Sequence, residues 1–112
     1  MPRYLIRLPD PAHARGNEPS LSFTANGAGA FAEELQAALA TPALFERWRA
    51  LQPEPDEVDP ALGATDPSAT VSGAQQDLHV DLVADTRIPG EILKQRLRLL
   101  AGRHWELRDV RF

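Results

Sequence analysis

The chain has 112 residues, of which 43% are hydrophobic and 25% charged, with a formal net charge of −4. A chain of this length can bury one core and is too short for two ordinary domains, so we expect a single domain spanning residues 1–112. The absence of cysteine excludes disulfides, thiolate zinc sites and cysteine nucleophiles. No apolar run is long enough to span a membrane and the first residues lack a signal-peptide pattern, so we expect a cytoplasmic protein without a membrane partner.

The first third of the chain predicts two strands and a helix. Apolar and polar residues alternate over 4–8, which indicates a half-buried strand that ends at Pro9. A shorter alternation predicts a possible extra strand at 21–25, after which Asn26 is positioned to cap a helix. Apolar residues recur at four-residue spacing from Phe31 onward, as in an amphipathic helix.

This helix is predicted to be split at Thr41–Pro42, where Thr41 suits the cap position and Pro42 the first turn. Its second part is expected to end near Leu51 and to bury Trp48. Residues 53–68 are acidic and rich in proline, a composition that favours a flexible loop of unusual length. We therefore predict that this loop is mobile and that the core forms without it.

The second half predicts two strands, a helix and a last strand. A short strand is expected at 69–72, a turn at 73–76, and a strand over 78–84, where the alternation is clearest. Asp85–Thr86 is positioned to cap a helix that ends at Gly102 in the left-handed conformation.

The final segment begins with Trp105 and Leu107, and Trp105 is expected to be buried. Val110 and Phe112 fall on the opposite parity, which predicts a β-bulge near 108–109. With 21–25 set aside and the helix parts merged, the order is βαββαβ. The expected fold is therefore an α+β two-layer sandwich of ferredoxin-like order, with both helices on one face of an antiparallel sheet.

Positive charge is concentrated near the C-terminus. Residues 1–85 carry 5 Lys or Arg against 13 Asp or Glu, whereas residues 86–112 carry 7 against 3. Lys94 and Arg98 share an exposed helix side and Arg103 follows, so these three are the candidate anion-binding residues. Nucleic-acid binding through this basic helix is an alternative function, disfavoured by the acidic net charge and the lack of exposed aromatic residues on the sheet.

No recognisable catalytic or metal-binding motif is present. Residues 27–32 fit a G-x-G-x-x-A pattern, but no βαβ unit surrounds them, so no cofactor is expected. Aspartates and a histidine alternate over 77–81, but arginines of the first strand are expected beside them, and cations oppose metal binding. No catalytic residue is assigned, since the serines lack a nucleophile motif. A small-ligand site, or an enzyme without a recognisable motif, is a further alternative.

The favoured interpretation is a small, non-enzymatic protein-binding or regulatory module. A βαββαβ sheet has one open face and two edges, and either can take a partner chain. The residues predicted on the open face are Arg3, Leu5, Arg7, His79, Asp81 and Val83. We therefore expect self-association, for example as a dimer, or binding of another protein through the sheet face or edge.

Overall fold

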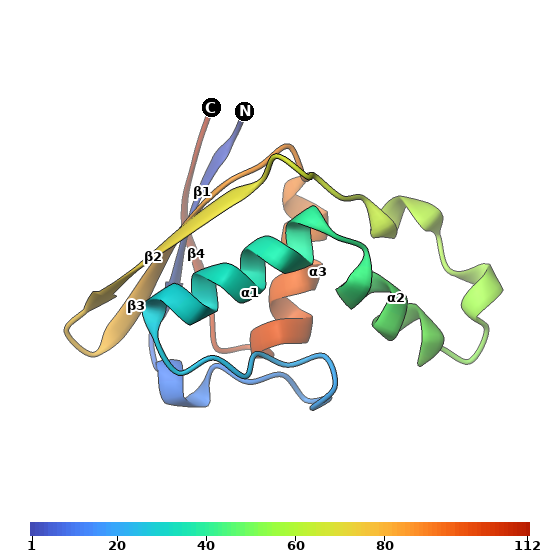
Figure 1. Ribbon diagram of the computed structural model, residues 1–112, viewed down its shortest axis with the longest axis horizontal. Coiled ribbons are helices and arrows are strands. Elements are labelled where there is room, and N and C mark those ends of the chain that lie inside the picture. The colour runs from blue at the N-terminus through green and yellow to red at the C-terminus, as the bar shows by residue number, and fades with distance from the viewer.

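Four strands form one antiparallel sheet in the computed structural model, which describes residues 1–112 (Figure 1). β1 (Arg3–Leu8) lies between β3 (His79–Asp85) and β4 (Glu106–Arg111), and β2 (Thr70–Gln76) pairs with the other side of β3. The order across the sheet is β2-β3-β1-β4, so β2 and β4 are the edge strands. The two termini lie side by side because β1 begins where β4 ends.

Three α-helices complete the α+β fold. α1 (Ala28–Ala40) packs on β2 and β3, α2 (Ala43–Ala50) follows directly after a break, and α3 (Gly90–Ala101) connects β3 to β4. α1 and α3 lie on the same side of the sheet, and its other side carries no helix (Figure 1). The sheet therefore has one covered face and one open face.

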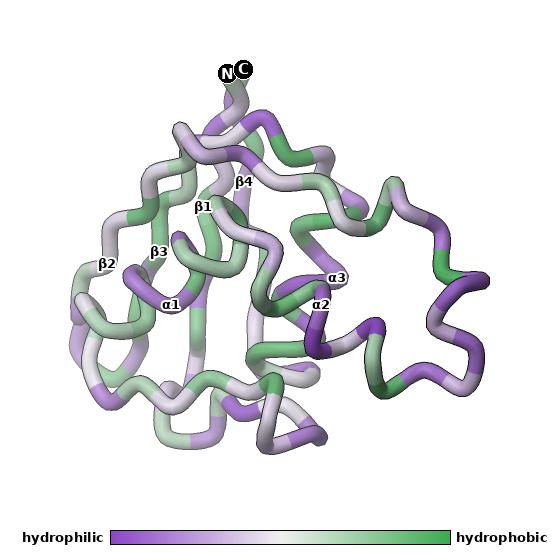
Figure 2. Tube along the Cα trace, turned by 45° about the vertical axis from the view of Figure 1, so that its right-hand side comes forward, coloured by the Kyte–Doolittle hydropathy of each residue, from purple (hydrophilic) through white to green (hydrophobic).

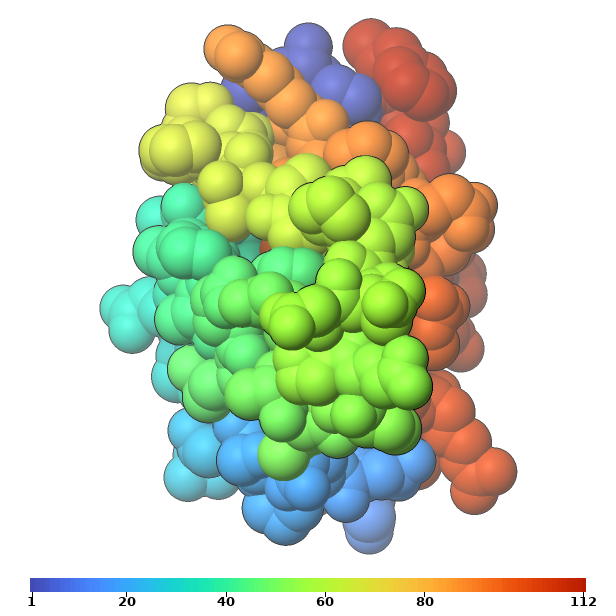
Figure 3. Space-filling view, turned by 90° about the vertical axis from the view of Figure 1, so that its right-hand side faces the viewer, coloured from blue at the N-terminus to red at the C-terminus, as the bar shows by residue number.

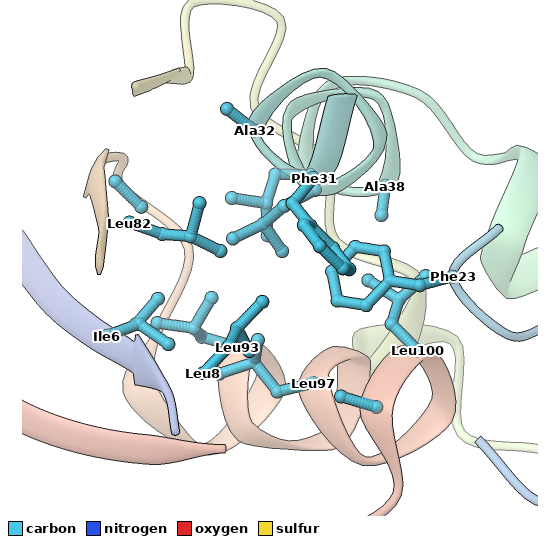
Figure 4. Packing of buried hydrophobic residues seen from close by; sticks show 14 of the residues in the cluster. Ile6, Leu8, Phe23, Phe31, Ala32, Ala38, Leu82, Leu93, Leu97 and Leu100 are labelled. Atoms are coloured by element: carbon cyan, nitrogen blue, oxygen red, sulfur yellow. The ribbon is translucent and has the colours of Figure 1, made fainter. Parts of the chain in front are cut away.

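The hydrophobic core lies between the covered face of the sheet and the helices α1 and α3 (Figure 4). Strand side chains alternate in direction, so Ile6 and Leu8 of β1 and Leu82 of β3 point inward and are fully buried. Phe31 of α1 packs edge-on against Phe23, with their ring centroids 5.0 Å apart. In Figure 2 hydrophobic colour follows the strands, whereas the segment after α2 is largely hydrophilic.

Several predicted elements are confirmed. The strand at 4–8 corresponds to β1, and Gly102 ends α3 with a φ of 64°. The register between β1 and β4 shifts between Leu5 and Ile6, which leaves Arg108 as the extra residue of a β-bulge. The bulge reconciles the two parities of apolar residues in β4.

The predicted strand at 21–25 is wrong. Leu21 and Ser22 lie in a turn and a bend, the residues after them have no regular structure, and the one backbone bond to another element joins Phe23 N–H to the Leu100 carbonyl, at 2.8 Å. Leu21, Phe23 and Ala25 are buried nonetheless. The alternation therefore reflects packing of an irregular segment against the helices and not membership of the sheet.

The predicted turn at 73–76 is also wrong. β2 continues to Gln76, and the two-residue hairpin turn is Asp77–Leu78, with Asp77 at a φ of 58°. Tight hairpins require positive φ, which aspartate tolerates better than most residues. Leu78, expected to open the next strand, lies at the tip of the hairpin and is 83% exposed.

The predicted helix caps need correction as well. None of Asn26, Thr41 and Asp85–Thr86 occupies an N-cap position; the N-cap residues are Gly27, Pro42 and Pro89. Trp48 and Trp105, predicted to be substantially buried, are partly exposed and pack against the core at its rim. The Trp105 indole N–H donates to the Gly102 carbonyl at 2.9 Å, so the polar edge of its ring is satisfied at this rim.

A buried arginine supplies a hydrogen-bond donor that the C-terminal end of α1 lacks. Pro42 has no N–H, so the Ala38 carbonyl lacks its usual helical donor four residues later. Arg96 of α3, placed by its sequence at the border of an apolar stripe, is 1% exposed and donates to this carbonyl at 2.8 Å. It also donates to the carbonyls of Leu62 and Ala64, each at 2.8 Å. Burial lowers the pKa of Arg96, which has no carboxylate partner.

Asp66 extends this connection to the start of α3. Its N–H donates to the Leu39 carbonyl at 2.8 Å, and its carboxylate accepts from Ser68, from the Thr86 hydroxyl at 3.0 Å and from the Arg87 N–H at 2.9 Å. These bonds, the Ser68 hydroxyl first and the Arg87 N–H next, hold the pKa of Asp66 well below its usual range. We call the contacts of Arg96 and Asp66 together the brace.

The brace divides the segment 53–68 into two parts. Residues 62–68 supply the carbonyls and the carboxylate of the brace and are tied to both helices. The part before them contains the short 3-10 helix Pro55–Glu57, and a second, Pro60–Gly63, leads into residues 62–68; both lie at the surface facing the viewer in Figure 3. That the earlier part is mobile stays a prediction, and only this part is expected to be dispensable.

Replacing Arg96 by methionine is expected to destabilise the protein by about 3 kcal/mol or more, because it leaves three carbonyls without a donor and each costs about 1–3 kcal/mol. Urea unfolding measures the change. Arg98→Met, at an exposed position on the same helix, is the matched control and should change the free energy of unfolding little. An Arg96→Met variant as stable as the wild type would contradict the brace.

Asp66 is expected to make stability depend on acid. Folding lowers the pKa of Asp66, so this carboxylate stabilises the folded protein fully above the pKa that aspartate has in the unfolded chain, about 4. The stabilisation is lost as the pH falls toward the pKa of Asp66 in the folded protein. Thermal unfolding of wild type and Asp66→Asn should therefore differ most near neutral pH, and the difference should begin to shrink below about pH 5 and continue to shrink well below pH 3. A difference that does not shrink on acidification would show that the carboxylate is not the stabilising group.

Candidate functional site

The open face of the sheet brings together all six residues predicted to form a partner-binding face. The strand register places Arg3 opposite Asp85, Leu5 opposite Val83, and Arg7 opposite Asp81. His79 lies one step further along β3 on the same side, because alternate residues of a strand share a face. The structure thus places the predicted set on one continuous surface.

Ion pairs cross the open face from β1 to β3. Arg3 forms two bonds with Asp85, at 2.8 and 3.1 Å, and Arg7 Nε donates to Asp81 at 3.0 Å. The Arg3 bond lowers the pKa of Asp85. Desolvation of Asp81 would raise its pKa, but the bond and charge of Arg7 and the nearby His79, with Nε2 at 3.4 Å, lower it overall.

The edge strand β4 also carries arginine–carboxylate pairs, here between residues of the same strand. Arg108 pairs with Glu106 at 3.1 Å, and Arg111 pairs with Asp109 at 3.0 Å. Each arginine of the open face therefore has a carboxylate partner. Exposed pairs of this kind contribute little to stability, but they leave the face without net charge apart from protonation of its histidine.

A shallow concavity of about 550 Å³ lies at the centre of this neutral face. Leu5 and Val83 are partly buried in its floor, with Ser72 and Ala74 of β2 on one side and Arg108 on the other. The concavity therefore combines a small apolar centre with a polar rim and extends to the edge strand β2.

The edge strand β2 carries no charged residue. Its hairpin closes on the pair Gln76–His79, so the backbone groups of Gln76, Ala74 and Ser72 bond β3, while those of Val71, Gly73 and Gln75 point away from the sheet. One outward group has a partner, because the Val71 N–H donates to the Gln36 side chain of α1 at 2.9 Å. The amides of Gly73 and Gln75 face outward beyond it.

Gly73 also fixes α1 against this strand. A β-carbon at Gly73 would lie 2.3 Å from the Ala28 carbonyl oxygen, a distance that no side chain permits. α1 therefore covers the inner face of β2 closely but leaves its outer edge free. The other edge, β4, is protected by four paired charges and a bulge, devices that discourage strand addition.

The candidate anion-binding residues divide between two places. Arg98 and Arg103 line one concavity at the C-terminal end of α3, of about 480 Å³, together with Arg15, Asn17 and His104. Lys94 lines a different concavity, near Tyr4 and Arg87. Arg15 and Asn17 were not identified from the sequence, because their loop lies more than 80 positions from Arg98 and Arg103 along the chain and no local pattern links the two.

Comparison with protein-family models, with curated proteins and with solved structures finds no match for this chain. None of its helices has the length and apolar character needed to cross a bilayer. No group of three or more histidine or acidic side chains is placed to hold a metal ion. Residues 27–32 follow an extended loop and not a strand, so their glycines lack the setting of a dinucleotide-binding turn.

Proposed function

We propose that this protein is a protein-binding module that takes an extended segment of another protein as an additional strand along the free edge of β2. The observation that carries the proposal is the pair of outward-facing amides at Gly73 and Gln75 on an edge strand without charge, proline or bulge. Strand addition derives its affinity from such main-chain groups.

The strand order also supports a finer fold assignment. The order β2-β3-β1-β4, with α1 between β1 and β2 and α3 between β3 and β4, is the arrangement we assign as a ferredoxin-like βαββαβ two-layer sandwich. In such a fold an added strand extends the sheet beside β2. Its alternate side chains then lie over the open face.

The electrostatics of the site favour an uncharged partner segment. β2 has no charged side chain, and the arginines and carboxylates of the adjacent face already pair with one another. A charged partner residue would lose hydration there without gaining an ion pair. The concavity around Leu5 and Val83 instead suits small apolar or polar side chains of the partner.

Selection from a library of random peptides displayed on phage tests this function directly. Peptides enriched on the wild type are expected to bind Gln75→Pro about tenfold more weakly or worse, because proline removes an outward N–H that the sheet does not use. Gln75→Ala is the matched control: it removes the side-chain bonds of Gln75 to Asp77 and His79 but retains the N–H, and should bind normally.

Three outcomes separate the edge from other surfaces. Peptides that bind Gln75→Pro as well as the wild type would contradict strand addition. Loss of binding in Leu5→Lys or Val83→Lys, with Gln75→Pro unaffected, would move the site to the open face. A wild-type dimer in sedimentation that Gln75→Pro dissociates would show that a second copy, and not another protein, occupies the edge.

A further inference from the structure

Three arginines at the C-terminal end of α3 differ from those of the open face. Arg15, Arg98 and Arg103 have no carboxylate partner, whereas the four arginines of the open face each have one. All three line the same concavity, whose other residues are Asn17, Gly102 and His104. Three uncompensated positive charges thus meet at one place on a chain whose net charge is negative.

Close backbone contacts build this concavity. A β-carbon on Gly16 would lie 2.1 Å from the Leu99 carbonyl oxygen, and one on Gly102 would lie 3.0 Å from the Arg15 carbonyl oxygen. The loop of residues 15–17 therefore rests directly on the last turn of α3. Figure 3 shows this blue segment beside the orange-red end of α3 at the lower edge of the molecule.

Arg15 is held in place before any ligand arrives. Its guanidinium donates to the Ala25 carbonyl at 2.6 Å and to the Ala14 carbonyl at 3.2 Å, and it lies 5.7 Å from the centre of the Phe31 ring. The side chains of Arg98 and Arg103 are exposed and make no hydrogen bond within the chain. One positive charge is thus fixed, and two others are free to reach a ligand.

The end of α3 presents few acceptors that would repel an anion. The carbonyls of Arg98, Leu100 and Ala101 accept bonds from the Gly102, Phe23 and His104 N–H groups. No carboxylate lines the concavity. The nearest acidic residue along the loop, Glu18, lines the neighbouring concavity, which shares Asn17 and Arg98 with this one, and its carboxylate accepts from the Ser20 N–H at 3.1 Å.

We infer that this concavity binds the phosphate group of a small phosphorylated ligand, held by Arg98, Arg103 and the fixed Arg15. Guanidinium groups bind phosphate oxygens in pairs, and His104 and Asn17 supply further donors. A volume of about 480 Å³ suits a compact ligand. A nucleic acid is disfavoured as the ligand, because Lys94 lines another concavity and no Phe, Tyr or Trp lines this one for base stacking.

Calorimetric titration with pyrophosphate at low ionic strength tests the site. The double variant Arg98→Gln/Arg103→Gln should bind about tenfold more weakly or worse, because each charged hydrogen bond contributes about 1.5–3 kcal/mol. Arg111→Gln removes one charge from the opposite side of the sheet and is the matched control, with affinity changed less than about twofold. Gln75→Pro should bind pyrophosphate normally, which makes this site independent of the proposed strand-binding function.

Several results would overturn the inference. One is that the wild type fails to bind pyrophosphate. Another is that Arg111→Gln weakens pyrophosphate binding as much as the double variant does, which would indicate non-specific charge attraction. A single-stranded oligonucleotide that binds more tightly than pyrophosphate and is also weakened by Lys94→Gln would show an extended nucleic-acid surface in place of a compact phosphate site. Circular dichroism of the variants verifies that each is folded.

Discussion

The fold depends on how the chain satisfies the carbonyl that Pro42 leaves without a donor. Arg96 reaches from α3 to the Ala38 carbonyl and simultaneously binds two carbonyls of the segment between α2 and β2. Asp66 continues the connection to the beginning of α3. Arg96 and Asp66, bonded largely to backbone groups, thereby hold α1, α3 and the polar segment between α2 and β2 together. Removing either side chain leaves buried polar groups unpaired, which costs more than the net value of the bonds themselves.

This brace also determines which surfaces stay available. It fixes the C-terminal end of α1, while the close approach of Gly73 to Ala28 fixes the N-terminal end, so the helix covers the inner side of the first half of β2. The outer edge of β2 is then exposed on a rigid support. The phosphate site has a different origin, since it arises where a loop packs on the end of α3. A neutral strand edge and a positive concavity therefore lie on separate parts of the molecule and can act independently.

Periodicity predicted the elements whose burial follows from local pattern. β1, β3 and α3 were identified from alternating or helical spacing, and the bulge in β4 from its change of parity. The prediction of a strand at 21–25 was wrong because burial of an irregular segment against helices produced the same alternation of apolar residues as a sheet. The burial of Arg96 could not be predicted, since arginine is rarely buried and its partners are carbonyls from distant segments. The free edge of β2 was likewise hidden, because the predicted turn at 73–76 removed half of that strand.

Amide hydrogen exchange of the free protein, resolved by residue with NMR, tests the central claim most directly. If the outer edge of β2 is available, exchange alternates along the strand: Ser72 and Ala74, bonded to β3, exchange slowly, whereas Gly73 and Gln75 exchange rapidly. Val71, bonded to Gln36, is predicted to exchange more slowly than Gly73. Protection of Gly73 and Gln75 equal to that of their neighbours would show that this edge is already occupied and would contradict the account.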